Sequence, residues 1–400
     1  MTFSLSLSEE QVATQKWAHE FSEKEIRPVA PDYDETEDFP WPVVEKARDI
    51  GLYGLEYYQM AGSDDSGLTS AIVSEELTWG CAGITLAIFG TGLALAGLAG
   101  NGTPEQFAAW APRMFAKEDG SIALGAFGVT EPAAGSDVSS LRTRAEKVEG
   151  GWLLNGRKTF ITNGGIADVH VIVATVDPAL GHKGQASFVI GPDTPGCSGG
   201  KKERKLGIRA SHTADVVLED CFVPNDQLLG GEDSLNRKME SAKTGASTRK
   251  SAALSTFEAT RPLVGAQALG IARAAFEFSR DYAKERVAFG KPIISNQGIA
   301  FKLADMATEI DCARLLVWRA AWMGRAGVPF KQAEGSMSKL KAGEVAVRVT
   351  DEAIQILGGY GYIKDYPVEK WHRDSKIYCI FEGTSEIQRL VISRAVSAAT

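Results

Sequence analysis

The hydrophobic spacing of this 400-residue chain changes twice along its length, and this pattern limits the possible folds more than any other feature. Residues 8–31, 42–53 and 67–79 carry apolar side chains at helical spacing, and helical spacing returns after Phe257. Between Ser121 and Val223 the apolar runs are short, β-rich and separated by Gly, Pro, Asn and Asp. The order helices, strands, helices predicts an α+β fold.

A chain of this length is expected to form two or three domains. The spacing predicts an N-terminal α-helical domain (1–120), a middle β domain (121–230) and a C-terminal α-helical domain (257–400). Residues 231–256 interrupt the pattern and are interpreted as a basic linker or loop insertion. At the local level, Ser8 and residues 103–106 (Thr-Pro-Glu-Gln) read as helix starts, and Gly358 as a residue that ends a helix.

Residues 80–102 contain no charged side chain and are rich in Gly and Ala. This length is enough for a membrane span. The aromatic and basic anchors that usually flank a span are lacking, so a fully buried central helix is the favoured interpretation and no transmembrane segment is expected.

The charge and cysteine content exclude several classes of protein. A net charge of −8 argues against a nucleic-acid partner. The five cysteines are scattered without a CxxC, and the five histidines show no paired ligand spacing, so neither a disulfide framework nor a metal site is expected. The first residues lack a basic, apolar leader pattern, and we expect a reduced, cytoplasmic protein.

One carboxylate near the C-terminus is placed for chemistry. In the segment IFEGTSEIQR, Glu382 is followed by Gly383, which permits a tight turn, and by Thr384 and Ser385, which can cap a helix. An acid on an apolar approach beside helix-terminal N–H groups can act as a general base. The alternative is a solvated glutamate in the loop before a helix.

Two glycine-containing loops of the β region could approach a flat or phosphorylated ligand. The first, FGVTEPAAGSD, offers the hydroxyls of Thr130 and Ser136, and the second, KTFITNGG, offers Phe160 and Thr162. Each loop could also be only a turn between strands. Dinucleotide-binding, P-loop and serine-hydrolase motifs are lacking.

Five segments, in order, carry a resemblance to a known family. GVTEPAAGSD, KTFITNGG, RVAFGKPIISNQ, QILGGYGY and IFEGTSEIQR occur in the order and spacing of the acyl-CoA dehydrogenase family, and the resemblance covers nearly the whole chain. It implies an N-terminal helical domain, a middle β-barrel or β-sandwich domain and a C-terminal four-helix bundle. It also implies a homotetramer built as a dimer of dimers.

The resemblance implies an activity of fatty acid β-oxidation with FAD as the cofactor. Glu382 would take the α-proton of an acyl-CoA thioester while hydride passes from the β-carbon to flavin N5, and the product would be a trans-2-enoyl-CoA. Electrons would then pass to an electron-transfer flavoprotein. An acyl-CoA oxidase, a flavin monooxygenase and a flavin-binding subunit of a mixed assembly remain as alternatives.

The same resemblance assigns residues to the cofactor and the substrate. Those near the isoalloxazine and ribityl groups would be Phe127, Val129, Thr130, Ser136, Phe160 and Thr162. Those near the adenine and pyrophosphate of a neighbouring subunit's FAD would be Arg286, Phe289, Gln297, Gln355, Gly358 and Gly359. Thr384 and Glu386 would also face FAD. The substrate residues would be Ser136, Phe257, Glu258, Arg261 and Gly383.

Thr260 stands where some members of the family carry the catalytic glutamate, so Glu382 is the consistent base. Arg261 could steady the carboxylate of Glu382, and Glu258 would be a CoA-contacting or solvated residue. Two features depart from typical members. The connection from Pro224 to Arg261 is longer and basic, which fits either a solvated loop or a contact with CoA phosphates, and Phe89 could shorten the acyl tunnel.

Overall fold

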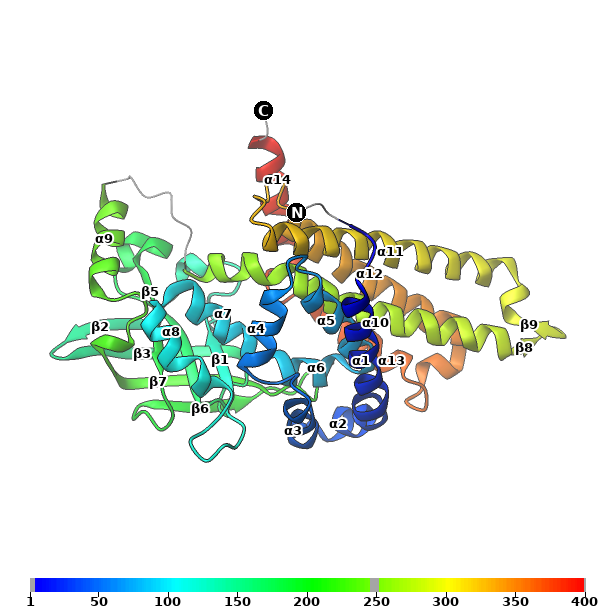
Figure 1. The fold of residues 1–400 in the computed structure, drawn as a ribbon, viewed down its shortest axis with the longest axis horizontal. Helices are drawn as coiled ribbons and strands as arrows, with labels where there is room; N and C mark the ends of the chain where they lie inside the picture. The colour runs from blue at the N-terminus through cyan, green and yellow to red at the C-terminus, as the bar shows by residue number, and fades with distance from the viewer. Residues whose placement is uncertain (1–3, 245–251, 399–400) are drawn as a thin grey trace.

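The computed structural model describes residues 4–244 and 252–398, with side chains described outside residues 252–259. The described part of the chain is elongated (Figure 1). A β-sheet region occupies one end, the N-terminal helices cross the middle, and long helices with a small hairpin form the other end. The predicted order of helical, β and helical regions is confirmed.

The N-terminal region consists of short helices: α1 (Glu9–Phe21), α2 (Ala30–Thr36), α3 (Trp41–Asp49), α4 (Leu55–Ser63), α5 (Thr69–Gly80), α6 (Ala82–Phe89), α7 (Thr91–Asn101) and α8 (Pro104–Trp110). Both expected helix starts are confirmed as capping boxes. The Ser8 side chain accepts a hydrogen bond from the Gln11 N–H at 3.2 Å, and Thr103 accepts one from the Gln106 N–H at 3.2 Å.

The uncharged stretch 80–102 forms two helices, α6 and α7, which meet at Gly90, instead of the single helix expected. Within the described residues, Ala82–Asn101 is the one stretch long and apolar enough to cross a membrane by length and composition, and 61% of its most apolar window is buried inside the fold. The expected burial against the rest of the protein is therefore observed for most of this stretch.

The middle region is one hydrogen-bonded sheet. Its strands are β1 (Gly125–Gly128), β2 (Arg144–Val148), β3 (Gly151–Thr162), β4 (Val169–Thr175), β5 (Gln185–Ile190), β6 (Cys197–Lys202) and β7 (Thr213–Pro224). Their order is β1-β4-β2-β3-β7-β6, and β5 pairs with β4. The β1–β4 pair is parallel, with Gly125 opposite Val169, whereas the long β3–β7 pair is antiparallel and its register shifts between Lys158 and Ile161.

Part of the segment expected to be a basic linker is instead helical. Residues 232–243 form α9 (Glu232–Lys243), and residues 252–256 already belong to the next helix. Leu235 and Met239, four residues apart, pack against the core of the sheet region, which gives this helix an apolar stripe. The Lys238 amine donates to the Gln185 carbonyl at 2.5 Å, so this basic residue contacts the sheet region.

Long helices form the C-terminal region, interrupted by a small hairpin. They are α10 (Ala252–Glu285), β8 (Val287–Ala288), β9 (Lys291–Pro292), α11 (Gln297–Arg325), α12 (Glu334–Leu357), α13 (Val368–Ser375) and α14 (Ser385–Ala398). Helices α10, α11 and α12 pack against one another, and α14 projects from the body of the molecule (Figure 1). Gly358 ends α12 with φ 63°, as predicted.

A buried ionic network fastens α10 to the N-terminal helices. Arg273 of α10 donates to Glu76 at 2.7 Å and to Glu75 at 3.1 Å, and Arg314 of α11 donates to Glu75 at 2.8 Å. Because these charges are largely buried and paired, removing one partner would leave the other uncompensated. The network fixes the position of α10, whose beginning reaches the candidate site.

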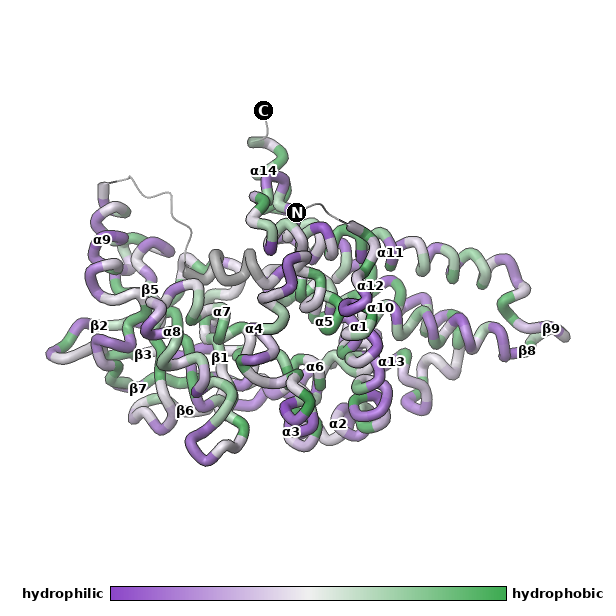
Figure 2. The backbone as a smooth tube through the Cα atoms, in the orientation of Figure 1, coloured by the Kyte–Doolittle hydropathy of each residue, from purple (hydrophilic) through white to green (hydrophobic). Residues whose placement is uncertain are grey.

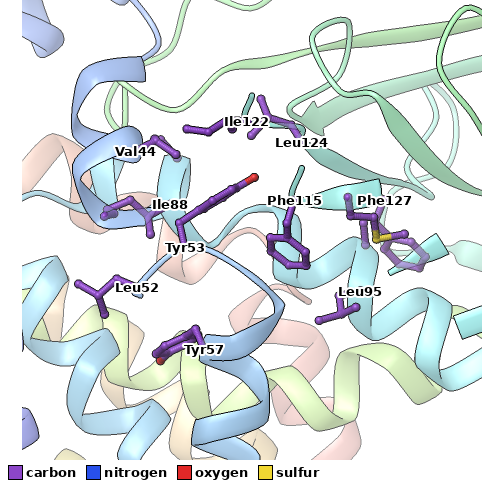
Figure 3. Packing of buried hydrophobic residues seen from close by; sticks show 14 of the residues in the cluster. Val44, Leu52, Tyr53, Tyr57, Ile88, Leu95, Phe115, Ile122, Leu124 and Phe127 are labelled. Atoms are coloured by element: carbon purple, nitrogen blue, oxygen red, sulfur yellow. The ribbon is translucent and has the colours of Figure 1, made fainter. Parts of the chain in front are cut away.

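The N-terminal helices and the sheet region share one hydrophobic core. Figure 3 shows Tyr53 and Phe115 packing beside Ile88 and Leu95, and Phe127 of β1 joins the same cluster. The Tyr53 and Phe115 rings meet edge to face at 5.4 Å. Hydrophobic segments gather in the middle of the molecule around α5 and α7 (Figure 2). The core therefore holds β1 rigidly against the helices.

Candidate active site

The turn that carries Glu382 has an unusual backbone conformation. Glu382 has φ 55° and Gly383 has φ 90°, so two consecutive residues lie in the left-handed region. Glycine tolerates this conformation and glutamate does so only when its surroundings impose it. The sequence prediction that Gly383 permits a tight turn is confirmed. The side chain of Thr384 accepts from the Ile387 N–H at 3.2 Å and caps α14 as expected.

Two buried side chains hold this turn through its carbonyl oxygens. The Lys339 amine of α12 donates to the Gly383 carbonyl at 2.7 Å. The Gln388 amide of α14 donates to the same carbonyl at 2.9 Å and to the Glu382 carbonyl at 3.2 Å. These contacts fix the backbone from two helices and leave the carboxylate to be placed by other residues.

The carboxylate of Glu382 lies in a desolvated environment. Burial raises its pKa, while a hydrogen bond from Thr260 and the positive charges of Lys339 and Arg261 act in the opposite direction. The Thr260 hydroxyl donates to Glu382 Oε2 at 2.8 Å. A carboxylate with a raised pKa and one fixed oxygen is suited to accept a proton from carbon.

Arg261 influences Glu382 through its charge and donates a hydrogen bond to a different residue. Its guanidinium is buried and donates to the Ser336 hydroxyl of α12 at 3.0 Å. From the sequence, Arg261 could steady the carboxylate of Glu382. In the structure, the positive charge of Arg261 lowers the pKa of that carboxylate. Phe257 and Glu258 belong to α10, but their side chains lie outside the described residues.

A buried ion pair shapes the first glycine-containing loop. Lys158 of β3 is fully buried, and its amine donates to Glu131 at 2.7 Å and to the Val129 carbonyl at 3.0 Å. Glu131 also accepts from the backbone N–H groups of Arg142 at 2.6 Å and Thr143 at 2.9 Å. The carboxylate therefore organises the loop after β1 from inside the protein.

The residues of this loop differ in what they can offer a ligand. The side chains of Phe127 and Val129 are buried in the core, so a cofactor could reach these residues through backbone groups. Thr130 is half-buried and Ser136 is exposed, and both hydroxyls remain accessible. The sequence prediction of a ligand-facing loop stays a prediction for each of these residues.

Phe160 presents an open aromatic face at the bulge of β3. Its side chain is 64% exposed, and its backbone is left-handed with φ 58°. Two residues on, Thr162 is half-buried, and Asn163 donates to the Gly125 carbonyl at 3.0 Å, which ties this bulge to β1. An exposed ring beside accessible hydroxyls fits the flat ring system of a flavin.

A second group of predicted residues meets at the far end of the molecule. An open cleft of about 530 Å³ is lined by Tyr282, Arg286, Ile293, Ile356, Leu357, Gly358, Gly359, Tyr360 and Ile363. The Arg286 guanidinium lies 5.5 Å from the centroid of the Tyr360 ring. A guanidinium group, aromatic rings and the backbone N–H groups of glycines are suited to bind an adenine and its phosphates. Gln297 and Gln355 lie within a few residues of cleft residues in the sequence, and both are exposed. Phe289, on the hairpin, is 97% exposed.

The structure does not bring the two groups together within one chain. Figure 1 shows the β8–β9 hairpin and the end of α12 on the opposite side of the molecule from β1 and β3. Glu382, by contrast, lies just before α14, which Figure 1 shows near the middle of the long axis, and among the residues that follow it Thr384 is half-buried and Glu386 is exposed. A single extended cofactor could use both groups only if they came from two chains.

Sequence reasoning missed Lys339, Gln388 and Ser336. Lys339 was detectable, because it interrupts a run of small residues at helical spacing in α12: Gly335, Ser336, Ala342, Gly343 and Ala346. A lysine on such a face is buried and needs a partner. Among residues 4–244 and 260–398, no cluster of three His, Cys, Asp or Glu side chains could hold a metal ion.

Comparisons with known proteins agree with this arrangement. Family models for acyl-CoA dehydrogenase match the N-terminal domain over residues 8–118, the middle domain over residues 126–221 and the C-terminal domain over residues 251–397. An acyl-CoA dehydrogenase of Bacillus subtilis (strain 168) is 41% identical over 400 residues, which is 99% of this chain and 100% of the relative.

Solved structures show the same fold over the whole chain. Butyryl-CoA dehydrogenase from Megasphaera elsdenii superposes with a TM-score of 0.88 at 37% identity, covering 99% of this chain and 100% of its own. A structure described for the electron transferring flavoprotein of Acidaminococcus fermentans gives 0.87 at 35% identity, with 99% and 100% covered. PigA with FAD and proline gives 0.86 at 27% identity, with 99% of both chains covered.

Proposed function

The chain belongs to the acyl-CoA dehydrogenase family, and on this premise we propose that Glu382 is the base that removes the α-proton of its acyl-CoA substrate. The protein is an oxidoreductase, and the product would be a trans-2-enoyl-CoA. The observation that carries the proposal is the desolvated Glu382 carboxylate, which a left-handed turn presents and the Thr260 hydroxyl aligns.

The chemistry of the α-proton explains why the turn matters. A thioester α-proton is too weakly acidic for a carboxylate unless the thioester oxygen is polarised by nearby donors. Among the described residues, the backbone N–H of Glu382 has no hydrogen-bond acceptor. We propose that it donates to the thioester oxygen while the carboxylate takes the proton, so that one residue supplies the base and one donor.

The site residues fit FAD, which would accept the hydride from the β-carbon. The exposed ring of Phe160, with Thr130, Ser136 and Thr162, would contact the flavin end of the cofactor. Arg286, Gly358 and Gly359 of a second chain would hold its adenine and pyrophosphate end in the open cleft. The opposite placement of these groups supports a dimer as the smallest active unit, within the homotetramer expected from the sequence.

We propose a short acyl chain and an electron-transfer flavoprotein as the electron acceptor. The similarity to a butyryl-CoA dehydrogenase supports the first choice, as does the half-buried Phe89, whose ring stacks on Tyr57 with centroids 5.0 Å apart. The similarity to a structure described for an electron transferring flavoprotein supports the second. Rapid reoxidation of the reduced protein by air would instead favour the oxidase alternative.

Replacing the base tests the central assignment. Glu382→Gln keeps the shape of the side chain, so the protein should retain bound FAD while turnover with butyryl-CoA and an artificial electron acceptor falls by about 10³-fold or more. Glu344→Gln, at an exposed position of α12, is the matched control and should retain activity within a few-fold. Full activity in the Glu382→Gln protein would place the base elsewhere, with Glu258 the next residue to replace.

A further inference from the structure

Lys339 is a charged residue in a place where a helix normally carries an apolar one. Its side chain on α12 is 1% exposed, and it follows Ser336 by one turn on the face that meets α10. Burying an ammonium group is costly unless it is well bonded. Some interaction of Lys339 must therefore compensate for the loss of water around its amine.

The turn that carries Glu382 provides the hydrogen-bond acceptor for this amine. The amine donates to the Gly383 carbonyl at 2.7 Å, and it forms no ion pair within 4.0 Å among the described residues. Glu382 and Gly383 are the two consecutive left-handed residues, and for Glu382 this conformation persists only where the surroundings impose it. Lys339 and Gln388 supply that constraint from α12 and α14.

The charged groups around Lys339 affect its pKa, and Lys339 in turn affects the pKa of Glu382. Burial is the main reason that the pKa of Lys339 is lowered to about 8. The charge of Arg261 also lowers this pKa, whereas those of Cys379, Glu382 and Glu386 raise it. These groups come from the turn η9 (Lys376–Cys379), from α10 and α14, and from the Glu382 turn itself. The positive charge of Lys339 in turn favours the ionised form of Glu382.

We propose that Lys339 is a positioning residue for Glu382: its amine holds the Gly383 carbonyl and thereby fixes the left-handed turn. The inference rests on the proposed role of Glu382 as the base. It adds a residue that touches neither the substrate nor the cofactor and acts through the turn alone. Loss of Lys339 should affect turnover and its pH dependence, with little effect on FAD or acyl-CoA binding.

Lys339→Met is the direct test, with Lys341→Met as the matched control. Methionine has a similar length without a charge or a donor. Lys341 lies two residues along α12, and its amine pairs with Glu309 at 2.5 Å, away from the turn. For Lys339→Met we expect kcat to fall about 10- to 100-fold with KM within about threefold, because a displaced base loses alignment. The pH of half-maximal kcat should rise by about one unit. Lys341→Met should match the parent in kcat, KM and pH dependence.

The readouts separate a positioning role from a structural one. A folded Lys339→Met protein with full FAD absorbance but parental kcat and an unshifted acid limb would overturn the proposal. If Lys339→Met does not accumulate in folded form, Lys339→Gln gives the same pH test, because it also removes the charge. An active Glu382→Gln protein overturns the proposed function and this inference together, whereas an inactive one with unaffected Lys339 variants overturns this inference alone.

Discussion

Thr260 donates a 2.8 Å hydrogen bond to the Oε2 atom of Glu382, which joins the beginning of α10 to the turn before α14. The contact has a consequence for chemistry because a hydrogen bond to the ionised form lowers the pKa that burial raises. It also fixes one carboxylate oxygen and leaves the other for the substrate. Thr260, at the position where the sequence resemblance places a base in some members of the family, is thus the residue that hydrogen-bonds to the proposed base.

Removing this hydroxyl should impair the base without removing it. Thr260→Val keeps the shape of the side chain and loses the donor, so kcat at neutral pH should fall by about tenfold, the loss expected for a hydrogen bond to a charged group. Steady-state kinetics with butyryl-CoA measure this. Thr260→Ser retains the hydroxyl and should stay close to the parent. Equal losses in both variants would mean that packing, rather than the hydrogen bond, causes the effect.

The raised pKa of Glu382 predicts an acid limb in the pH profile. Because burial disfavours the charged carboxylate, the group accepts a proton at a pH above the ordinary 4.5 of glutamate, and a protonated carboxyl cannot act as a base. Turnover should therefore decline as the pH falls through this raised pKa, and the decline should begin at higher pH in Thr260→Val. A profile that stays flat down to pH 4.5 in a folded protein would contradict the assignment.

The two separated groups of cofactor residues predict complementation between chains. Arg286→Met should weaken FAD binding without unfolding the protein, because Arg286 lines an open cleft. Arg280→Met, near the end of α10 and paired with Asp281, is the control, since Arg286 directly follows this helix. Mixed assemblies of Arg286→Met and Glu382→Gln chains should regain activity, since one of the two sites in each mixed dimer then has an intact base and an intact cleft.

The same experiment can disprove the shared site. A chain carrying both substitutions, assembled with the parent chain, leaves each site with one defect and should show less activity than expected for independent sites. Recovery that depends only on the fraction of parent chain would show that each chain completes its own site.

The stacked rings of Phe89 and Tyr57 predict a limit on acyl length. Phe89→Ala removes one ring of the stack, so the ratio of kcat/KM for octanoyl-CoA to that for butyryl-CoA should rise by about tenfold or more. Phe107→Ala, a half-buried ring on α8 in the same core, controls for general loosening. An unchanged chain-length profile in a folded Phe89→Ala protein would exclude this residue as the limit.

The buried Lys158–Glu131 pair predicts a large effect on stability. Glu131→Gln leaves the Lys158 ammonium without its counter-charge in a fully buried position, and unfolding free energy should drop by about 3–5 kcal/mol. Urea denaturation of the FAD-containing protein measures the change. The exposed Lys147–Glu232 pair provides the comparison, and Glu232→Gln should cost less than about 1 kcal/mol. Similar losses in the two variants would contradict the role given to burial.

Local signals predicted much of the fold from the sequence. Capping boxes at Ser8 and Thr103, the C-terminal Gly358 of α12 and the left-handed Gly383 each follow from side chains a few residues apart. The helix α9 was missed because its apolar stripe is only Leu235 and Met239, within a highly charged segment. The break at Gly90 was missed because composition alone does not show where a helix bends.

For the candidate site as well, the sequence predicted the residues within one segment and not the contacts between distant segments. Glu382 and its turn could be recognised in one short segment. The residues that hold it, Thr260 and Lys339, lie on α10 and α12, and their contacts depend on how the helices cross. Such contacts between distant segments have no local sequence pattern. The placement of β3, which carries Phe160, and of the β8–β9 hairpin next to Arg286 on opposite sides of the molecule likewise emerged only from the three-dimensional arrangement.

The burial of α6 and α7 has a consequence for how the protein is made. The apolar surface of α7 is covered partly by β1 and by α10, and α10 begins about 150 residues after α7 ends. At typical rates of protein synthesis this interval lasts on the order of ten seconds. During that time the ribosome-bound chain carries an uncovered apolar segment long enough to enter a membrane. Early contacts within the N-terminal helices, or a chaperone, must protect it until the later helices are made.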